Sequence, residues 1–490
     1  MAEAEVRMRP GILKKSDPEL SAGPAITGDP AVKDEPALTG ASEQPESSQR
    51  RAATAVGGWR DIARSGGVKF IAMGVSAVLG IIITRIIIQN YGIDAYAQYG
   101  LLVGLGALIP VGALGVDAPI MNTVAASESP ASDLHLRRVL VTTLRVLVAA
   151  AAILLVIVVV MSVFSLWAPL LGESLLPGTG AIAAAVCVVL WAIAMPFGIG
   201  QRVLAGLGKN HVTIAISGLQ SPVVLLVLLF SLWIGTDAGS FVPVVSYAAT
   251  LMIAIIAAVI ASRLIRPNLW QAIKETPFVR RFPGGKILDQ AWPMTVIMIA
   301  LPLSMQTDRL ILSHAAGSAE LAQYNLAAQM YFPIGALVSA AGFTLWPRFA
   351  AARARGHDES PLRLTIVFGA IAAGMCLAVS LISGWLAAFA SGGEVSLSLL
   401  LILSFSAWMI IQGFQYPMGM YLTDKKGLRF QALMVTLMVP VTLGLSWVLA
   451  VQLGAPGPVI GSALGVLFFQ VLANVIYVRR RARRTRGVTV

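Results

Sequence analysis

Two arginines lie inside long apolar stretches of the chain, where a charged side chain is costly. Arg85 lies in the stretch 84–99, which reads TRIIIQNYGIDAYAQY, and Arg309 lies in 307–324, which reads TDRLILSHAAGSAELAQY. A guanidinium group can hold a phosphate or diphosphate through two parallel hydrogen bonds, and this attraction is stronger where water is scarce. Two arginines would nearly neutralise one diphosphate. We therefore predict that both take part in anion binding.

The two stretches form an internal repeat. Each has an arginine, then three branched aliphatic residues, then a glycine, and the spacing from Gly92 to Tyr99 equals that from Gly317 to Tyr324. Internal repeats are typical of membrane transporters, whose substrate sites lie near the interface of the two halves. At a rise of about 1.5 Å per residue, both arginines are expected in the outer third of the membrane. The alternative is that each side chain reaches the outer headgroups with its long stem.

Further polar residues accompany the two arginines. Asp308 adjoins Arg309, either as its resting ion-pair partner or as a site for a coupling proton or sodium ion. Asn325 and Gln329 are four residues apart and therefore share one helix face. Together these positions give the predicted substrate cavity, lined by Arg85, Gln89, Asp308, Arg309, Asn325 and Gln329.

Three more polar residues are candidates for gating or ion coupling. Asp117 lies near the cytoplasmic end of a span rich in proline and glycine, where pairing with an interfacial arginine such as Arg137 is the structural alternative. Arg202 is expected near the inner mouth of the cavity. Gln412 lies in a span that also contains Pro417.

The composition limits the class of protein. The chain has 490 residues, of which 57% are hydrophobic and 12% charged, so most of it cannot be a water-exposed surface. Apolar runs long enough to cross the bilayer predict about twelve transmembrane helices in two six-helix repeats, an all-α polytopic membrane protein. The predicted spans are 70–90, 98–125, 139–168, 178–206, 212–234, 241–262, 288–313, 321–347, 363–390, 396–422, 429–452 and 457–478.

The distribution of lysine and arginine predicts the orientation. Apart from Arg85 and Arg309, they lie in the N-terminal segment, in the even-numbered connections with their flanks, or in the C-terminal tail. The positive-inside rule then puts both termini in the cytoplasm. The net charge of +12 thus reflects membrane topology and gives no reason to expect nucleic-acid binding.

The same pattern predicts five parts of the chain. The long connection near Trp270 mixes aromatic and basic residues, which favours a position along the inner membrane surface. The parts are a disordered cytoplasmic tail (1–56), an N-terminal six-helix bundle (57–265), a cytoplasmic amphipathic connector (266–287), a C-terminal six-helix bundle (288–478) and a basic cytoplasmic tail (479–490).

Enzymatic chemistry is not indicated. The sequence has no HExxH motif, no Walker motif and no Ser/His/Asp set, and its four histidines are far apart in sequence. Cys187 and Cys376 both fall inside predicted helices, which suits core packing better than a disulfide or a metal site. We therefore expect no catalytic residue, no metal and no cofactor.

These motifs resemble one family. The G-x(4)-AQY repeat, the run that starts Thr307-Asp-Arg-Leu-Ile-Leu, and the Pro347-Arg-Phe-Ala sequence are similar to those of polysaccharide-repeat-unit flippases, the O-antigen and exopolysaccharide exporters of the multidrug/oligosaccharidyl-lipid/polysaccharide (MOP) superfamily. The resemblance covers about residues 66 to 480. It implies a V-shaped pair of bundles around a cation-lined cavity, with alternating access. It also implies that Arg85 and the pair Asp308/Arg309 match charged positions of the family.

The function implied by this resemblance is the transfer of a polyprenyl-diphosphate-linked oligosaccharide to the outer leaflet of a bacterial plasma membrane. The implied partners are membrane lipids, this lipid-linked substrate, a polysaccharide polymerase and glycosyltransferases. Three alternatives stay open: a cation-coupled multidrug antiporter of the same superfamily, a flippase for the lipid-linked peptidoglycan precursor, and a non-transporting scaffold of a glycan assembly complex.

Overall fold

The computed structural model describes residues 45–108, 117–236, 238–278, 280, 282, 292–354 and 360–486, and in these ranges the chain forms helices and no strands. The chain divides into Met1–Gly57 and Gly58–Val490, and the packing reported below lies within the second unit. Helices suit so apolar a chain, because a backbone in hydrocarbon must satisfy its N–H and C=O groups within its own segment.

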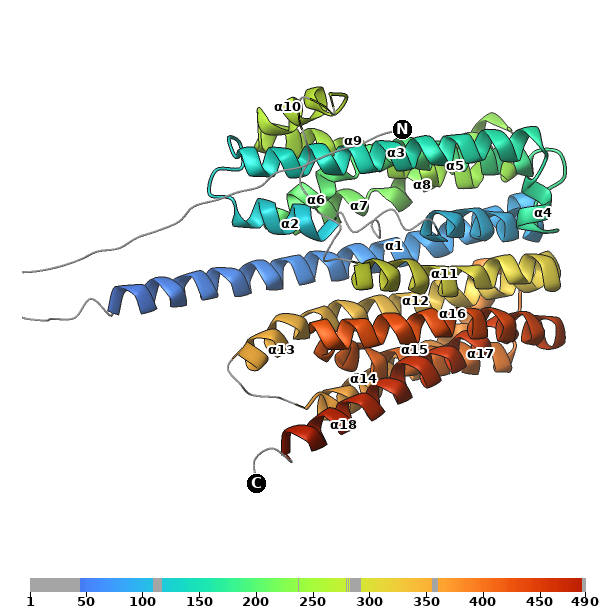
Figure 1. Ribbon diagram of the computed structural model, residues 1–490. Coiled ribbons are helices and arrows are strands. Elements are labelled where there is room, and N and C mark those ends of the chain that lie inside the picture. The colour runs from blue at the N-terminus through green and yellow to red at the C-terminus, as the bar shows by residue number, and fades with distance from the viewer. Residues whose placement is uncertain are drawn as a thin grey trace, which may run out of the picture. The chain divides into compact units, whose positions relative to one another are not determined.

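The first half begins with one long helix that contains a sharp break. This half ends before a short connector helix. Its elements are α1 (Pro45–Leu108), α2 (Asp117–Ala126), α3 (Leu134–Val163), α4 (Trp167–Leu171), α5 (Gly180–Phe197), α6 (Ile199–Gly206), α7 (Asn210–Ser217), α8 (Gln220–Ile234), η2 (Gly239–Phe241) and α9 (Val242–Leu264). The connector helix is α10 (Asn268–Glu275). Helices α3, α5 and α9 pack side by side (Figure 1).

The second half has longer uninterrupted helices. Its elements are α11 (Trp292–Ala315), α12 (Gly317–Phe343), α13 (Leu345–Ala354), α14 (Leu362–Ser391), α15 (Leu399–Tyr421), α16 (Lys425–Leu453), α17 (Pro456–Gly465), the π-helical segment η3 (Val466–Leu472) and α18 (Ala473–Arg486). Helix α15 packs against α12 and α14, and α16 against α11 and α17 (Figure 1). Phe405 of α15 is fully buried among Tyr324, Tyr331 and Phe332 of α12.

The glycines of the sequence repeat form matching turns. Gly92 breaks α1 with φ 85° and ψ 174°, and Gly317 begins α12 with φ 81°. Thr84 before the break and Tyr96 after it both hydrogen bond to Gln329. This shared partner shows that the chain reverses direction at Gly92. The repeat recognised in the sequence thus corresponds to a helical hairpin in each half.

These two turns give a test of backbone strain. We expect Gly92→Ala and Gly317→Ala each to destabilise the protein by about 1–3 kcal/mol, because a side chain strongly disfavours positive φ in this range. A Cβ atom would meet nothing within 4 Å at either position, so steric overlap adds nothing. The measurement is the thermal unfolding midpoint in detergent. Gly374→Ala, equally open but without a positive φ, is the control and should not lower the midpoint. An unchanged midpoint for Gly92→Ala would contradict this account.

Ten stretches of the described residues are long and apolar enough to cross a membrane. The difference from the twelve predicted spans has two causes. The two legs of the α1 hairpin count as the single stretch Gly74–Gly106, and α11 is not among the ten. Part of α11 lies outside the described side chains, so this helix could not be counted among them.

Helix extends into both terminal segments of the described chain. Residues 45–56, predicted to belong to a disordered tail, form the start of α1, and residues 1–44 lie outside the described residues. Arg479 to Arg486, predicted as a basic tail, continue α18 as helix. The first segment contains several alanines and the second is mostly arginine. Both residue types have high helix propensity, so helix can extend past the apolar span.

The predicted connector 266–287 contains α10, which is attached to the first half. Asn268 Oδ1 accepts a hydrogen bond from Arg137 Nε at 2.8 Å, and Arg145 Nε donates to the carbonyl oxygen of Thr276 at 2.9 Å. Both arginines belong to α3. The last part of the predicted connector, 283–287, lies outside the described residues.

Candidate functional site

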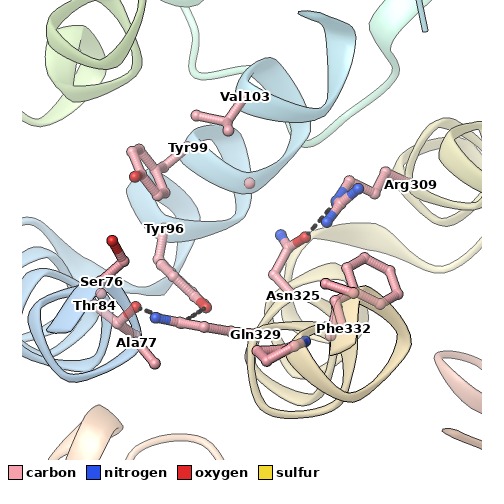
Figure 2. A pocket seen from close by; sticks show the side chains of 15 residues that line it. Ser76, Ala77, Thr84, Tyr96, Tyr99, Val103, Arg309, Asn325, Gln329 and Phe332 are labelled. Carbon is pink, nitrogen blue, oxygen red and sulfur yellow. Dashed lines mark hydrogen bonds between the residues drawn. The ribbon is translucent and has the colours of Figure 1, made fainter. Parts of the chain in front are cut away.

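A cavity of about 460 Å³ lies between the α1 hairpin of the first half and helices α11 and α12 of the second. Figure 2 shows Thr84 and Tyr96 from the two legs of the hairpin on one side, and Asn325, Gln329 and Arg309 on the other. Its volume is within the usual range for small-molecule sites. The interface of the two halves, which the repeat predicted as the site, therefore contains a cavity.

Arg309 is the charged residue among those that line this cavity. Its Nε donates to Asn325 Oδ1 at 3.0 Å and its Nη1 donates to Gln306 Oε1. The guanidinium carbon lies 5.6 Å from the ring centre of Tyr324 and 5.7 Å from that of Phe332. Neutral amides and aromatic rings orient the cation without cancelling its charge, so the cavity is suited to an anion.

Arg85 lies elsewhere. It is not among the residues that line the cavity; its guanidinium carbon is 4.8 Å from the ring centre of Phe389, near the end of α14. Its Nε is 3.4 Å from Gln89 Oε1, and Gln89 is exposed beside Gly392. Two predicted cavity residues, Arg85 and Gln89, are thus placed together but outside this cavity.

The two arginines differ in their position relative to the repeat glycines. Arg309 precedes Gly317 by eight residues, whereas Arg85 precedes Gly92 by only seven. One residue along an α-helix turns a side chain by about 100°. The residue eight before Gly92 is Thr84, and Thr84 lines the cavity. Relative to the repeat glycines, Arg309 therefore corresponds to Thr84 and not to Arg85.

Asn325 and Gln329 line the cavity from one face of α12. Gln329 Oε1 accepts from Thr84 Oγ1 at 2.9 Å and from the Tyr96 hydroxyl at 3.5 Å (Figure 2). Opposite Asn325 lies Gly100, where an added methyl group would overlap the Asn325 side chain. Gly80 faces Gln329 in the same way, so glycines of the first half leave room for both amide side chains of the second half.

Asp308 is fully buried and is not among the residues that line the cavity. Its Oδ2 accepts from Ser462 Oγ at 2.9 Å, and its Oδ1 has no hydrogen-bond partner among the described residues. The hydroxyls of Ser446 and Tyr324 lie next to the same carboxyl. No ion pair between Asp308 and Arg309 is found in the part of the chain that the structure describes. The carboxyl instead lies among hydroxyl groups of α12, α16 and α17.

Two of the three candidates for gating or coupling are separate from this cavity, and the third cannot be placed relative to it. Asp117 begins α2, and its side chain lies outside the described residues. Arg202 is half-buried in α6, and Gln412 is buried in α15. Neither Arg202 nor Gln412 is among the cavity-lining residues.

Sequence reasoning missed several aromatic and small residues of the site. Phe332 follows Gln329 by three residues and Asn325 by seven, so helical periodicity could have added it to the polar face. Tyr99 lines the cavity and is the last residue of the repeated Ala-Gln-Tyr motif. Thr84 follows Ser76 and Gly80 at four-residue steps, so helical periodicity also places it on the face that lines the cavity.

The two halves also touch at the end of the helices where Gly92 and Gly317 lie. Ser318 Oγ donates to Asp94 Oδ1, and Ser313 Oγ donates to the carbonyl oxygen of Leu171. His314 Nε2 lies 3.1 Å from the carbonyl oxygen of Pro169. These contacts close that end of the interface beyond the cavity.

The sequence matches no model of a known protein family and no curated protein. Solved structures do match. The chain is similar to a multidrug resistance MATE family transporter of the MOP superfamily in an inward-facing conformation, with 13% identity, a TM-score of 0.61, and coverage of 87% of this chain and 100% of that one. It is also similar to the lipid II flippase MurJ in an inward closed conformation, with 12% identity, a TM-score of 0.62, and coverage of 84% and 87%.

A third similar structure is a MOP superfamily transporter from Pyrococcus furiosus, for which a reversed polarity of the binding pocket is said to suggest a different function. It shares 14% identity over 86% of this chain and 95% of its own, with a TM-score of 0.53. These similarities confirm the predicted fold class, an all-α polytopic membrane protein with the architecture of MOP superfamily transporters.

Proposed function

We propose that this protein is a membrane transporter that moves an anionic, lipid-linked oligosaccharide from one leaflet of the membrane to the other. The observation that carries the proposal is Arg309, a cation in the cavity between the two halves whose hydrogen-bond partners are the neutral amides of Gln306 and Asn325. A diphosphate would replace these partners with stronger, charge-assisted hydrogen bonds.

The transport mechanism we propose is alternating access between the two halves. In the present structure the halves touch through Asp94, Ser318 and Ser313 at the end that the positive-inside rule predicts to be outer. Release of these contacts would open the cavity to the outer side. The substrate's diphosphate would stay at Arg309 during this step while its lipid tail remains in the bilayer.

The proposed setting is a bacterial plasma membrane, with both termini of the chain in the cytoplasm. Polyprenyl-linked repeat units for cell-surface polysaccharides would be assembled on this cytoplasmic side. A polysaccharide polymerase and glycosyltransferases are the partner proteins that such a role requires. The resemblance of the sequence motifs to O-antigen and exopolysaccharide flippases supports this setting. The MOP transporter fold supports the coarser statement that the protein is a transporter rather than an enzyme.

A multidrug antiporter is the second candidate function, because MATE transporters are among the proteins with this fold. An antiporter for cationic drugs would need a carboxylate in the cavity. The lining residues that the structure describes include Arg309 and no acidic residue, and the buried Asp308 is not among them. The charge of the cavity therefore favours the anionic substrate.

The test is a proteoliposome assay with a fluorescent polyprenyl-diphosphate oligosaccharide. We expect the purified protein to move the lipid across the bilayer, measured as the fraction that becomes accessible to a membrane-impermeant quencher, well above the rate in empty vesicles. Ethidium in the same vesicles tests the antiporter. Movement of ethidium without movement of the lipid would overturn the proposal in favour of the antiporter, and movement of neither would favour the scaffold.

A further inference from the structure

A second cavity, of about 300 Å³, lies within the first half between α1, α5, α8 and α9. Its polar lining consists of Trp191, Gln220, Ser246, Tyr247 and Thr250, and no lining residue that the structure describes is charged. The volume is at the lower end of the usual range for small-molecule sites. A cavity without charge is unsuited to a phosphate or to a cationic drug, and its hydroxyl, amide and indole groups suit an uncharged polar ligand.

One hydrogen-bond donor in this lining lacks a partner, and a second polar group lies close by. The Trp191 Nε1–H is buried and forms no hydrogen bond with any described residue, and the buried Ser246 hydroxyl lies next to the Tyr99 hydroxyl. Buried donors without partners destabilise a folded protein, so a ligand that supplies oxygen atoms would gain affinity here. Two neighbouring groups are already oriented: Gln220 Nε2 donates to Thr250 Oγ1 at 3.3 Å, and the Tyr247 hydroxyl donates to the carbonyl oxygen of Leu102 at 2.7 Å.

Aromatic rings form the apolar part of the same lining. Trp191 and Tyr247 pack edge to face, with ring centres 5.9 Å apart and an interplanar angle of 90°. A sugar ring combines apolar C–H faces with a rim of hydroxyl groups. An indole and a phenol beside amide and hydroxyl groups complement both of these features.

The second cavity borders the first. Val103, on the second leg of the α1 hairpin, lines both cavities. Tyr99, one helical turn earlier, lines the first cavity, and its hydroxyl lies next to Ser246 of the second. A single extended ligand could therefore occupy both cavities by passing Val103.

We propose that the cavity around Trp191, Gln220 and Ser246 is the subsite for a sugar ring of the substrate, whose anionic group is held at Arg309. This inference rests on the proposed function and extends it, because it assigns the glycan to the first half of the protein and the diphosphate to the second. The uncharged cavity then recognises the glycan, and the charged cavity recognises the lipid diphosphate that all such substrates share.

The test compares two probes in detergent micelles: a polyprenyl diphosphate that carries an oligosaccharide, and the same polyprenyl diphosphate without sugar. We expect wild type to bind the first more tightly. Gln220→Met, which keeps the side-chain length, and Ser246→Ala, which removes a buried hydroxyl, should each weaken binding of the sugar-bearing lipid by about three- to tenfold. Neither should change binding of the bare lipid. Gln452→Met, at an exposed position near the end of α16, is the matched control.

The outcomes separate the two proposals. Equal losses for both lipids, no loss for either, or no preference of wild type for the sugar-bearing lipid would overturn the sugar subsite while leaving the anion site intact. If tetraphenylphosphonium competes with the sugar-bearing lipid for wild type but not for Gln220→Met, the cavity would be reassigned to aromatic cations. Binding of both lipids that is unaffected by Arg309→Gln would instead overturn the proposed function, and the subsite with it.

Discussion

Replacement of Arg309 by glutamine is expected to weaken binding of a polyprenyl diphosphate by about 10- to 100-fold, with a matching loss of translocation. A hydrogen bond to a charged group is worth more than a neutral one, and the substitution removes the charge from the cavity. The protein level should stay near that of wild type, because the acceptors Asn325 and Gln306 can hydrogen bond to the new amide. Binding is measured in detergent and translocation in proteoliposomes.

Arg85→Gln is the matched control for this prediction. The same substitution at the other arginine removes a cation that packs on Phe389 and does not line the cavity. We therefore expect binding within about twofold of wild type. The exposed cation–π contact contributes only about 0.5–1 kcal/mol, and it contributes to the stability of the fold and not to binding. Equal losses in both variants would show that the two arginines form one site, as the sequence alone predicted. No loss in Arg309→Gln would contradict the anion site.

The second large effect is expected at Asp308. Its carboxyl is fully buried beside Ser462, with no ion pair among the described residues, and Oδ1 has no hydrogen-bond partner there. A buried carboxyl that has no ion-pair partner among the described residues is a candidate site for a coupling proton or sodium ion. Asp308→Asn removes this capacity and keeps the shape of the side chain. We predict that transport then no longer responds to a proton or sodium gradient.

The measurement is the rate of lipid translocation in proteoliposomes with and without each ion gradient. Binding of the lipid diphosphate should persist in Asp308→Asn, because Arg309 is unchanged. Glu320→Gln is the control: Glu320 Oε2 accepts a hydrogen bond from the Ala455 N–H at 2.7 Å, and a glutamine oxygen can accept it too. A gradient response that survives in Asp308→Asn would exclude this carboxyl as the coupling group.

Together these predictions separate three tasks in the protein. Arg309 would hold the anionic group, Asp308 would couple transport to an ion, and the second cavity would recognise the glycan. The first two residues are neighbours in the chain but face different surroundings, since Arg309 lines the cavity and Asp308 contacts Ser462 of α17. Tyr324 lies between them, next to the Asp308 carboxyl and 5.6 Å from the Arg309 guanidinium carbon. A change of charge at Asp308 can therefore influence the cavity over a short distance.

The sequence by itself determined the fold class and much of the main cavity. Apolar runs of bilayer length form helices, because a helix satisfies the backbone N–H and C=O groups within its own segment and hydrocarbon offers them no other partner. The repeated glycines marked the two hairpins, since a positive φ is accessible mainly to glycine. Arg309, Asn325 and Gln329 were predicted as a group, and the structure brings them together around one cavity.

Only the tertiary structure decided where the remaining polar side chains point. Arg85 is one residue closer to its glycine than Arg309 is, and the resulting rotation of about 100° directs it to Phe389. The surroundings of Asp308 depend on α16 and α17, which are distant in sequence. The second cavity is formed by four helices, and its residues show no common spacing. Periodicity specifies the faces of one helix, but the face that meets a cavity is decided by packing between helices.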